Sequence, residues 1–175
     1  AAFLYFGPNN PVDQVWGRIV ITLYQREAQF GWAVAGAGDV NGDGFADFMI
    51  GARYYDNEKN NEGGAFVYYG GHSIDYSWSD VMITGQQPDA WLGSALAPAG
   101  DVNGDGFSDL IIGAYAYDNG QTDEGAGLIY HGGGTNGNET SVTSLTDSVA
   151  TRQFGSVKAD AGDVNANAAI IHDTF

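Results

Sequence analysis

The chain has 175 residues, and 43% of them are hydrophobic, which is enough to bury the core of one ordinary domain. Its 6 Lys and Arg against 22 Asp and Glu give a formal net charge of −16, so we expect polyanions such as nucleic acid to be repelled. The sequence has no cysteine, which excludes disulfides and cysteine-based zinc sites. It also has no apolar run approaching the ~20 residues of a membrane span, so we expect no membrane insertion.

Three copies of one pattern follow each other along the chain. Phe30-Gly31, Leu92-Gly93 and Phe154-Gly155 open the copies 62 residues apart, and an aspartate follows each pair at the same offset. A long repeat of this kind is typical of arrays and propellers, in which each copy is one supersecondary unit. We therefore divide a single repeat domain, residues 1–175, into a half-blade, two full blades and a partial blade, at 1–29, 30–91, 92–153 and 154–175.

Short apolar segments recur in these units and are predicted to be β-strands. The first two lie at 2–7 and 16–23; DFMIGA and AFVYYG follow in the first full unit, and DLIIGA and GLIYHG in the second. They are rich in β-branched and aromatic residues, bounded by Gly, Asn or Asp, and too short for helices, which favours strands buried on both faces. Because no apolar pattern of helical period is sustained, we expect almost no α-helix.

Four strands in each full unit are typical of a β-propeller blade. The predicted fold class is therefore all-β, with blades of four antiparallel strands and about three blades in this chain. A propeller closes its ring with about four to eight blades, so the chain is either a fragment of a longer propeller or associates with further copies. Because the chain starts with the pair of strands that its last unit lacks, one hypothesis is a homodimer that closes a six-bladed ring.

Two acidic stretches with regularly spaced glycines, DVNGDGFAD and DVNGDGFSD, are the candidates for chemistry. Oxygen-bearing side chains stand at positions one, three, five and nine, and Gly at position six lets the backbone turn sharply. Calcium prefers six to eight hard oxygen ligands, which three carboxylates, one amide oxygen and one backbone carbonyl match when a water molecule is added. The predicted ligands, including the carbonyls at position seven, are Asp39, Asn41, Asp43, Phe45 and Asp47 in the first loop and Asp101, Asn103, Asp105, Phe107 and Asp109 in the second.

Two alternatives compete with this calcium interpretation. An EF-hand shares the start of the pattern but needs a glutamate at position twelve, where this chain has Ile50 and Ile112. The other alternative is a run of Asx turns without a metal, which two intact copies in register disfavour. The third copy, from Asp163, lacks the glycines and carries Ile171 at position nine, so we expect no calcium or only weak binding there.

These residues resemble the FG-GAP repeat of the integrin α-subunit propeller and its bacterial relatives, over essentially the whole chain. The FG pairs are those that open the copies, and GAP corresponds to GAR at 51–53 and GAY at 113–115, without the proline. The resemblance implies a β-propeller with calcium in the loop between the first and second strands of a blade, on the face opposite the usual partner-binding loops. An integrin closes seven blades within one chain, more than this sequence contains.

A loop that holds three carboxylates repels itself, so a divalent ion would brace the strands on either side. We expect two structural calcium ions in a module for adhesion or ligand binding that is not an enzyme. We place it outside the cell or at the cell surface, where calcium levels suit such short loops. A non-catalytic scaffold or assembly domain is the alternative, and part of a polysaccharide-acting or other hydrolytic enzyme is a weaker one.

The loops at 54–64 and 115–125, with the connections at 24–29 and 85–91, form the candidate face for a protein or glycan ligand. The sequence Tyr-Asp-Asn recurs in both loops, which favours a role in shaping a turn. Acid pairs in these loops are expected to be solvated rather than catalytic.

Trp16 and Trp78 recur in register, which predicts packing, whereas Trp32 and Trp91 do not recur and are better candidates for contact with a partner. His131 stands where the first full unit has a tyrosine, so it is predicted to be a packing variant.

Overall fold

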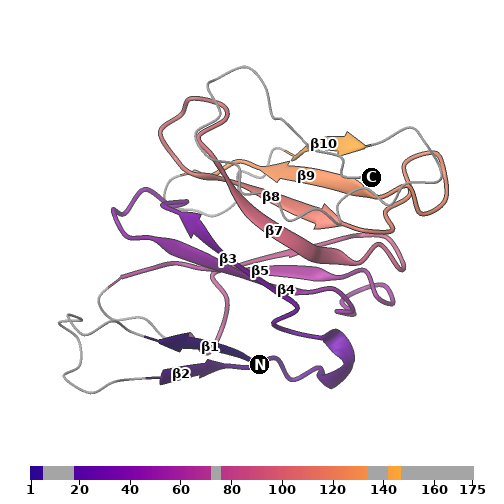
Figure 1. The fold of residues 1–175 in the computed structure, drawn as a ribbon, viewed down its shortest axis with the longest axis horizontal. Helices are drawn as coiled ribbons and strands as arrows, with labels where there is room; N and C mark the ends of the chain where they lie inside the picture. The colour runs from indigo at the N-terminus through magenta and orange to yellow at the C-terminus, as the bar shows by residue number, and fades with distance from the viewer. Residues whose placement is uncertain (6–17, 72–75, 134–141, 147–175) are drawn as a thin grey trace.

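The computed structural model describes residues 1–5, 18–71, 76–133 and 142–146, which form three antiparallel sheets (Figure 1). Within these ranges there is no α-helix, as predicted, and the 3-10 helix η1 spans Arg26–Ala28. The strands are β1 (Ala2–Tyr5), β2 (Arg18–Ile21), β3 (Ala33–Gly38), β4 (Asp47–Ala52), β5 (Gly64–Tyr68), β6 (Val81–Thr84), β7 (Leu92–Gly100), β8 (Asp109–Ala114), β9 (Ala126–Tyr130) and β10 (Val142–Thr146).

Two of the sheets have four strands in chain order, β3-β4-β5-β6 and β7-β8-β9-β10, with antiparallel neighbours throughout. Strands β1 and β2 form a two-stranded antiparallel sheet. The predicted all-β class and four-stranded blades are therefore confirmed, and the described residues form a partial propeller without closing a ring. The partial blade at 154–175 lies outside the described residues, so the blade count and the unit boundaries stay predictions.

The sheet β3–β6 lies between the other two sheets, which explains why its central strands β4 and β5 are apolar without alternation (Figure 1). In β5 all five residues are buried, and successive side chains point to opposite faces. Phe66 and Tyr68 pack in the cluster shared with β2, whereas Ala65 and Val67 pack in the cluster shared with β7–β9. The buried-strand prediction also holds in β9, where all five residues are buried.

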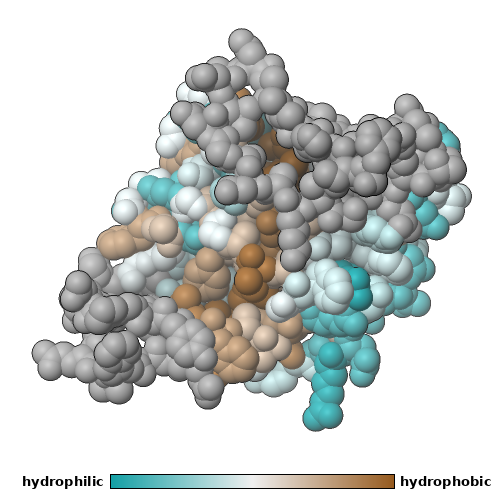
Figure 2. Space-filling model, in the orientation of Figure 1, coloured by the Kyte–Doolittle hydropathy of each residue, from teal (hydrophilic) through white to brown (hydrophobic). Residues whose placement is uncertain are grey.

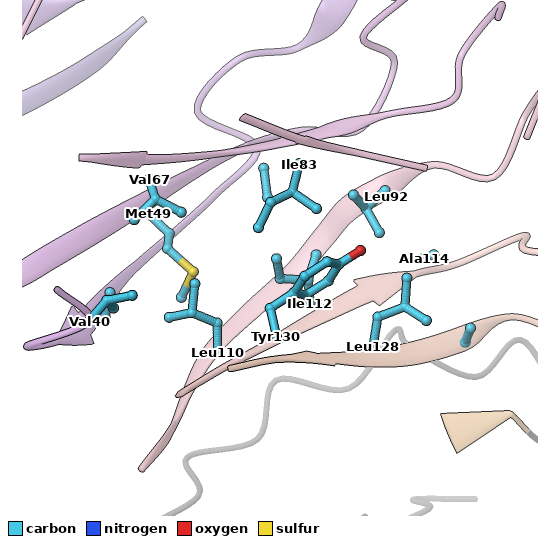
Figure 3. Close-up of a cluster of buried hydrophobic side chains, with 13 residues drawn as sticks. Val40, Met49, Val67, Ile83, Leu92, Leu110, Ile112, Ala114, Leu128 and Tyr130 are labelled. Carbon is cyan, nitrogen blue, oxygen red and sulfur yellow. The ribbon is translucent and has the colours of Figure 1, made fainter. Parts of the chain in front are cut away.

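The larger core lies between the two four-stranded sheets (Figure 3). Met49, Val67 and Ile83 from β4, β5 and β6 meet Leu110 and Ile112 from β8 there. Met49 and Ile112 are completely buried. Because burial of a large apolar side chain contributes about 1.5–3 kcal/mol, this interface is a main source of the stability of the blade pair.

Glycines let the two blades approach closely at the repeated FG and GA motifs. A Cβ added to Gly51 of the first GA would lie 2.2 Å from the carbonyl oxygen of Gly93 in the second FG. Gly93 has φ +81, and a Cβ there would lie 2.3 Å from the carbonyl oxygen of Gly64. The repeated motifs therefore mark places where the backbone of one blade touches that of the next.

Alternating strand directions separate the loops into two edges (Figure 1). The acidic loops at 39–46 and 101–108 lie at the left of the view, and the loops at 53–63 and 115–125 lie at the right. Figure 2 shows apolar surface in the middle of this view and hydrophilic surface at its lower right. The predicted metal loops and the predicted partner face are thus at opposite edges of the blades.

In the part of the chain that the structure describes, no helix is both long and apolar enough to cross a membrane.

The glycine contact between blades gives a first testable prediction. Replacing Gly51 with alanine should lower the free energy of unfolding by about 1–3 kcal/mol, because the added methyl group overlaps the backbone of the next blade. Urea denaturation followed by circular dichroism measures this change. Gly36→Ala in β3 is the matched control, since a Cβ there meets nothing within 4 Å and should change stability by less than about 0.5 kcal/mol. Equal losses in both variants would contradict the close approach.

Candidate metal centres

Each acidic loop is organised around the carboxylate of its first aspartate. In the first loop, Oδ1 of Asp39 accepts hydrogen bonds from the backbone N–H groups of Gly42 (2.7 Å) and Asp43 (3.0 Å), and Oδ2 accepts one from Gly44 (2.9 Å). Gly42 and Gly44 have φ of 76 and 88, in the left-handed region that glycine adopts without strain. The glycines of the pattern therefore turn the backbone so that its N–H groups surround one carboxylate.

The second loop repeats this geometry. Asp101 accepts the corresponding bonds from Gly104, Asp105 and Gly106, at 2.7, 3.0 and 2.9 Å. In both loops the amide oxygen at position three also accepts the N–H of position five, and the carboxylate at position five accepts the N–H of position seven. Identical sequences thus produce two identical scaffolds, one on each blade.

The ninth-position aspartates form the floor of the loops. Asp47 is 3% exposed, and its two oxygens accept N–H groups from Val40 (2.8 Å) and Gly70 (2.7 Å). Asp109 is fully buried and is held in the same way by the N–H groups of Val102 (2.7 Å) and Gly132 (2.8 Å). Each of these carboxylates therefore joins the start of its loop to the end of the third strand of the blade.

The charges of the first loop are not balanced by the protein. Burial raises the pKa of Asp47, and the negative charges of Asp43 and Asp39 raise it further, against the lowering effect of its two N–H partners. Within the described ranges no Lys or Arg forms an ion pair with a carboxylate of either loop; the contact between His131 and Asp109 is an ion pair only when the imidazole is protonated. A bound cation would supply the missing positive charge.

His131 distinguishes the second loop from the first. Its Nδ1 lies 3.3 Å from Oδ2 of Asp109, and the imidazole is 17% exposed. The residue follows β9 and occupies the position of Tyr69 in the first full unit. It is therefore mostly buried beside Asp109, and its role as a packing variant stays a prediction.

The donor set fits a hard cation such as calcium by its chemistry, because it offers oxygen atoms only. The structure places the ten predicted ligands in two loops, but their carboxylates are turned toward backbone N–H groups. Among the described residues, no three His, Cys, Asp or Glu side chains form a group that could hold a metal ion. Calcium binding therefore stays a prediction, and the degenerate loop from Asp163 lies outside the described residues.

At the opposite edge, the loops are closed by their own acids. Oδ1 of Asp56 accepts the N–H of Asn61 (2.6 Å), and Asp118 accepts the N–H of Asp123 (2.7 Å) in the next blade. The backbone of each of these aspartates is also held by the side-chain amide of a glutamine, Gln25 or Gln87, from the preceding connection. The turn-shaping interpretation of Tyr-Asp-Asn is supported for its aspartate.

A buried glutamate, which the sequence reasoning missed, anchors the same edge. Glu62 is 1% exposed and accepts four backbone N–H groups, from Asn57, Glu58, Lys59 and Gln86. Its repeat equivalent Glu124 is also 1% exposed. The sequence contained a signal for it, because in both units an acid stands two residues before an all-apolar strand.

Aromatic residues form a stack across the two blades at this edge. The guanidinium of Arg53 lies 3.4 Å from the ring centre of Trp32 and 4.6 Å from that of Tyr54. Tyr54 meets Trp91 edge-on, and Trp91 stacks on Tyr115 with ring centroids 5.5 Å apart. Arg53 and Tyr115 stand where the GAP pattern has proline, so this chain uses that position for stacking.

The exposure of the tryptophans corrects one prediction. Trp78 is 75% exposed, so the packing role inferred from its recurrence is wrong for this residue, and Trp16 lies outside the described residues. A residue that recurs in the sequence occupies an equivalent position in each unit, but the recurrence does not show whether other residues cover its side chain. Trp32 is 51% exposed and remains a contact candidate, whereas Trp91 is held between Tyr54 and Tyr115.

Comparison with known families identifies the repeat. The sequence model of the FG-GAP repeat matches residues 30–69 and 92–130, which cover β3–β5 and β7–β9 with their acidic loops. These two segments are therefore FG-GAP repeats, and the resemblance that the sequence predicted is confirmed.

Curated relatives carry the same type of sequence. The chain is 38% identical over 117 residues to integrin alpha-7 of Mus musculus, which covers 65% of this chain and 9% of that protein. It is 38% identical over 106 residues to integrin alpha-3 of Cricetulus griseus, covering 59% and 9%. It is also 35% identical over 118 residues to phosphatidylinositol-glycan-specific phospholipase D of Mus musculus, covering 63% and 14%. The chain thus spans about a tenth of the length of these relatives.

Proposed function

We propose that this chain is a calcium-stabilised segment of a β-propeller that serves adhesion or ligand binding, with calcium in a structural role. The observation that carries the calcium part is the pair of identical loops, each with three carboxylates and no Lys or Arg in ion-pair contact within the described residues. The proposed ligands are the ten residues predicted from the sequence.

Calcium would act on stability rather than on a reaction. The buried carboxylate of Asp47 faces the charges of Asp39 and Asp43, and a divalent ion would turn this repulsion into attraction. Because Asp47 and Asp109 are bonded to the residues that follow the third strands, an ion in each loop would brace three strands of its blade. An ion that binds the folded state alone raises stability by mass action.

The ligand face is proposed at the opposite edge, where Arg53 and the aromatic stack around Trp32 and Trp91 lie. The identity to two integrin alpha chains supports an adhesion or protein-binding role at the cell surface or outside the cell. A glycan is the other ligand class that exposed aromatic residues suit. A homodimer that closes a six-bladed ring, or a longer propeller of which this is a part, stays a prediction.

A scaffold without a ligand of its own is the second candidate function. The identity to a phospholipase D favours it, because that protein's name denotes a hydrolase and the matching segment is 14% of its length. In such a protein the repeats would support or assemble a catalytic part elsewhere. The candidate acids of this chain favour no catalytic role here: Asp56 closes its own loop and Glu124 is buried.

The calcium proposal is tested by thermal unfolding. At calcium one hundred-fold above its Kd, a site adds about 2.7 kcal/mol to the free energy of unfolding, which raises Tm by roughly 5–10 °C for a chain of this size. Dialysis against EDTA should therefore lower Tm, and added calcium should restore it. The double variant Asp43→Asn and Asp105→Asn should lose this response, because both substitutions remove a charged ligand and keep an oxygen for the neighbouring N–H. An unchanged melting curve after EDTA would refute the proposal.

The ligand proposal is tested by binding of the purified chain to glycan and protein arrays, with calcium and with EDTA. We expect hits that depend on calcium and weaken at least about tenfold in Trp32→Ala, because that ring is an exposed part of the proposed face. Trp78→Ala, at a more exposed ring outside the stack, is the matched control and should bind as the wild type. A complete lack of calcium-dependent hits would favour the scaffold instead.

A further inference from the structure

The two acidic loops touch each other across the boundary between the blades. The backbone N–H of Asp39 donates to Oγ of Ser108 (3.1 Å), and the N–H of Ser108 donates to the carbonyl oxygen of Asp39 (2.9 Å). Asp39 is the first proposed ligand of the first loop, whereas Ser108 belongs to the second loop. Asp39, whose carboxylate accepts three N–H groups of the first loop, is therefore itself held by a residue of the second loop.

Further contacts make this boundary tight. The ring of Phe107 lies against the first loop, because a Cβ added to Gly42 would lie 2.4 Å from Cε1 of that ring. A Cβ on Gly38 would lie 2.3 Å from Oγ of Ser108. Just beyond β9, the N–H of Gly133 donates to the carbonyl oxygen of Val40 (3.0 Å). The backbone of the first loop thus has little freedom to move independently of the second blade.

We propose that Ser108 is a positioning residue for the first calcium site and couples the two sites, so that a cation in the second loop strengthens binding in the first. This inference rests on the proposed calcium function. The carbonyl of Phe107 and the carboxylates of Asp105 and Asp109 would hold a cation in the second loop, and the cation would then fix the segment that carries Ser108. Through Ser108, that segment holds the backbone of Asp39, the first proposed ligand of the other loop. Such coupling is reciprocal, because a cation in the first loop must strengthen binding in the second loop by the same factor.

The repeat supplies a control for this role. The position of Ser108 is occupied by Ala46 in the first loop, where the residue is exposed, and by Ile170 in the third copy of the sequence. A hydroxyl at this position is therefore not a general requirement of the loop. It is specific to the boundary at which one acidic loop meets the other.

The test is calcium titration by isothermal calorimetry on six proteins: the wild type and Ser108→Ala, each with both loops intact, with the first loop silenced and with the second loop silenced. Asp105→Asn silences the second loop and Asp43→Asn silences the first, so each site is measured alone and with its neighbour. We expect the first site to bind at least about fivefold more weakly when the second is silenced. In Ser108→Ala the first site should be weakened by a similar factor and should no longer respond to Asp105→Asn. The second site, measured with the first silenced, should keep its affinity, which a general loss of stability would not allow.

Ala46→Ser is the matched control and should leave both affinities and their coupling at the wild-type values. Circular dichroism and Tm measured with EDTA establish that each variant is folded. Coupling that persists in Ser108→Ala, or a wild-type first site that ignores Asp105→Asn, would overturn this inference while leaving the calcium proposal intact. A fall of both affinities by the same factor in Ser108→Ala would also overturn it. A wild-type chain without any calcium-binding heat would defeat the proposed function itself.

Discussion

A buried carboxylate at the ninth position of each acidic loop is the constraint on which the organisation of the blades depends. Asp47 and Asp109 are removed from water, so each needs hydrogen bonds on both oxygens to be tolerated. One bond comes from the start of the loop and the other from beyond the third strand, which fixes three elements relative to one another. These hydrogen bonds do not cancel the negative charge of the carboxylates. A bound cation is proposed because this charge remains uncompensated.

Neighbouring blades are joined at three levels. Their apolar faces meet in the core around Met49 and Ile112, and their backbones touch at glycines such as Gly51 and Gly93. At the two edges, polar contacts cross the boundary, through the Asp39–Ser108 pair on one side and the bond from the Leu92 N–H to the Glu62 carbonyl oxygen on the other. The stability of one blade therefore depends on the presence of the next, as expected for repeat proteins.

Much of the fold could be predicted from the sequence because the signals are local and occur twice. Apolar runs such as DFMIGA became β4, and the glycine and aspartate spacing produced the same loop in both blades. Contacts between copies could not be predicted, because a repeat reveals equivalent positions but not their neighbours. Trp78 recurs yet is exposed, Glu62 is an acid yet is buried, and Ser108 differs from Ala46 by one oxygen that bonds the other loop.

The central claim is that each of the two acidic loops holds one calcium ion. The most direct measurement is an anomalous difference map, recorded at a long X-ray wavelength, from crystals grown with millimolar calcium and without chelator. The account predicts two strong peaks, one among the oxygens of Asp39, Asp43 and Asp47 and one among those of Asp101, Asp105 and Asp109. A map without a peak in either loop would contradict it.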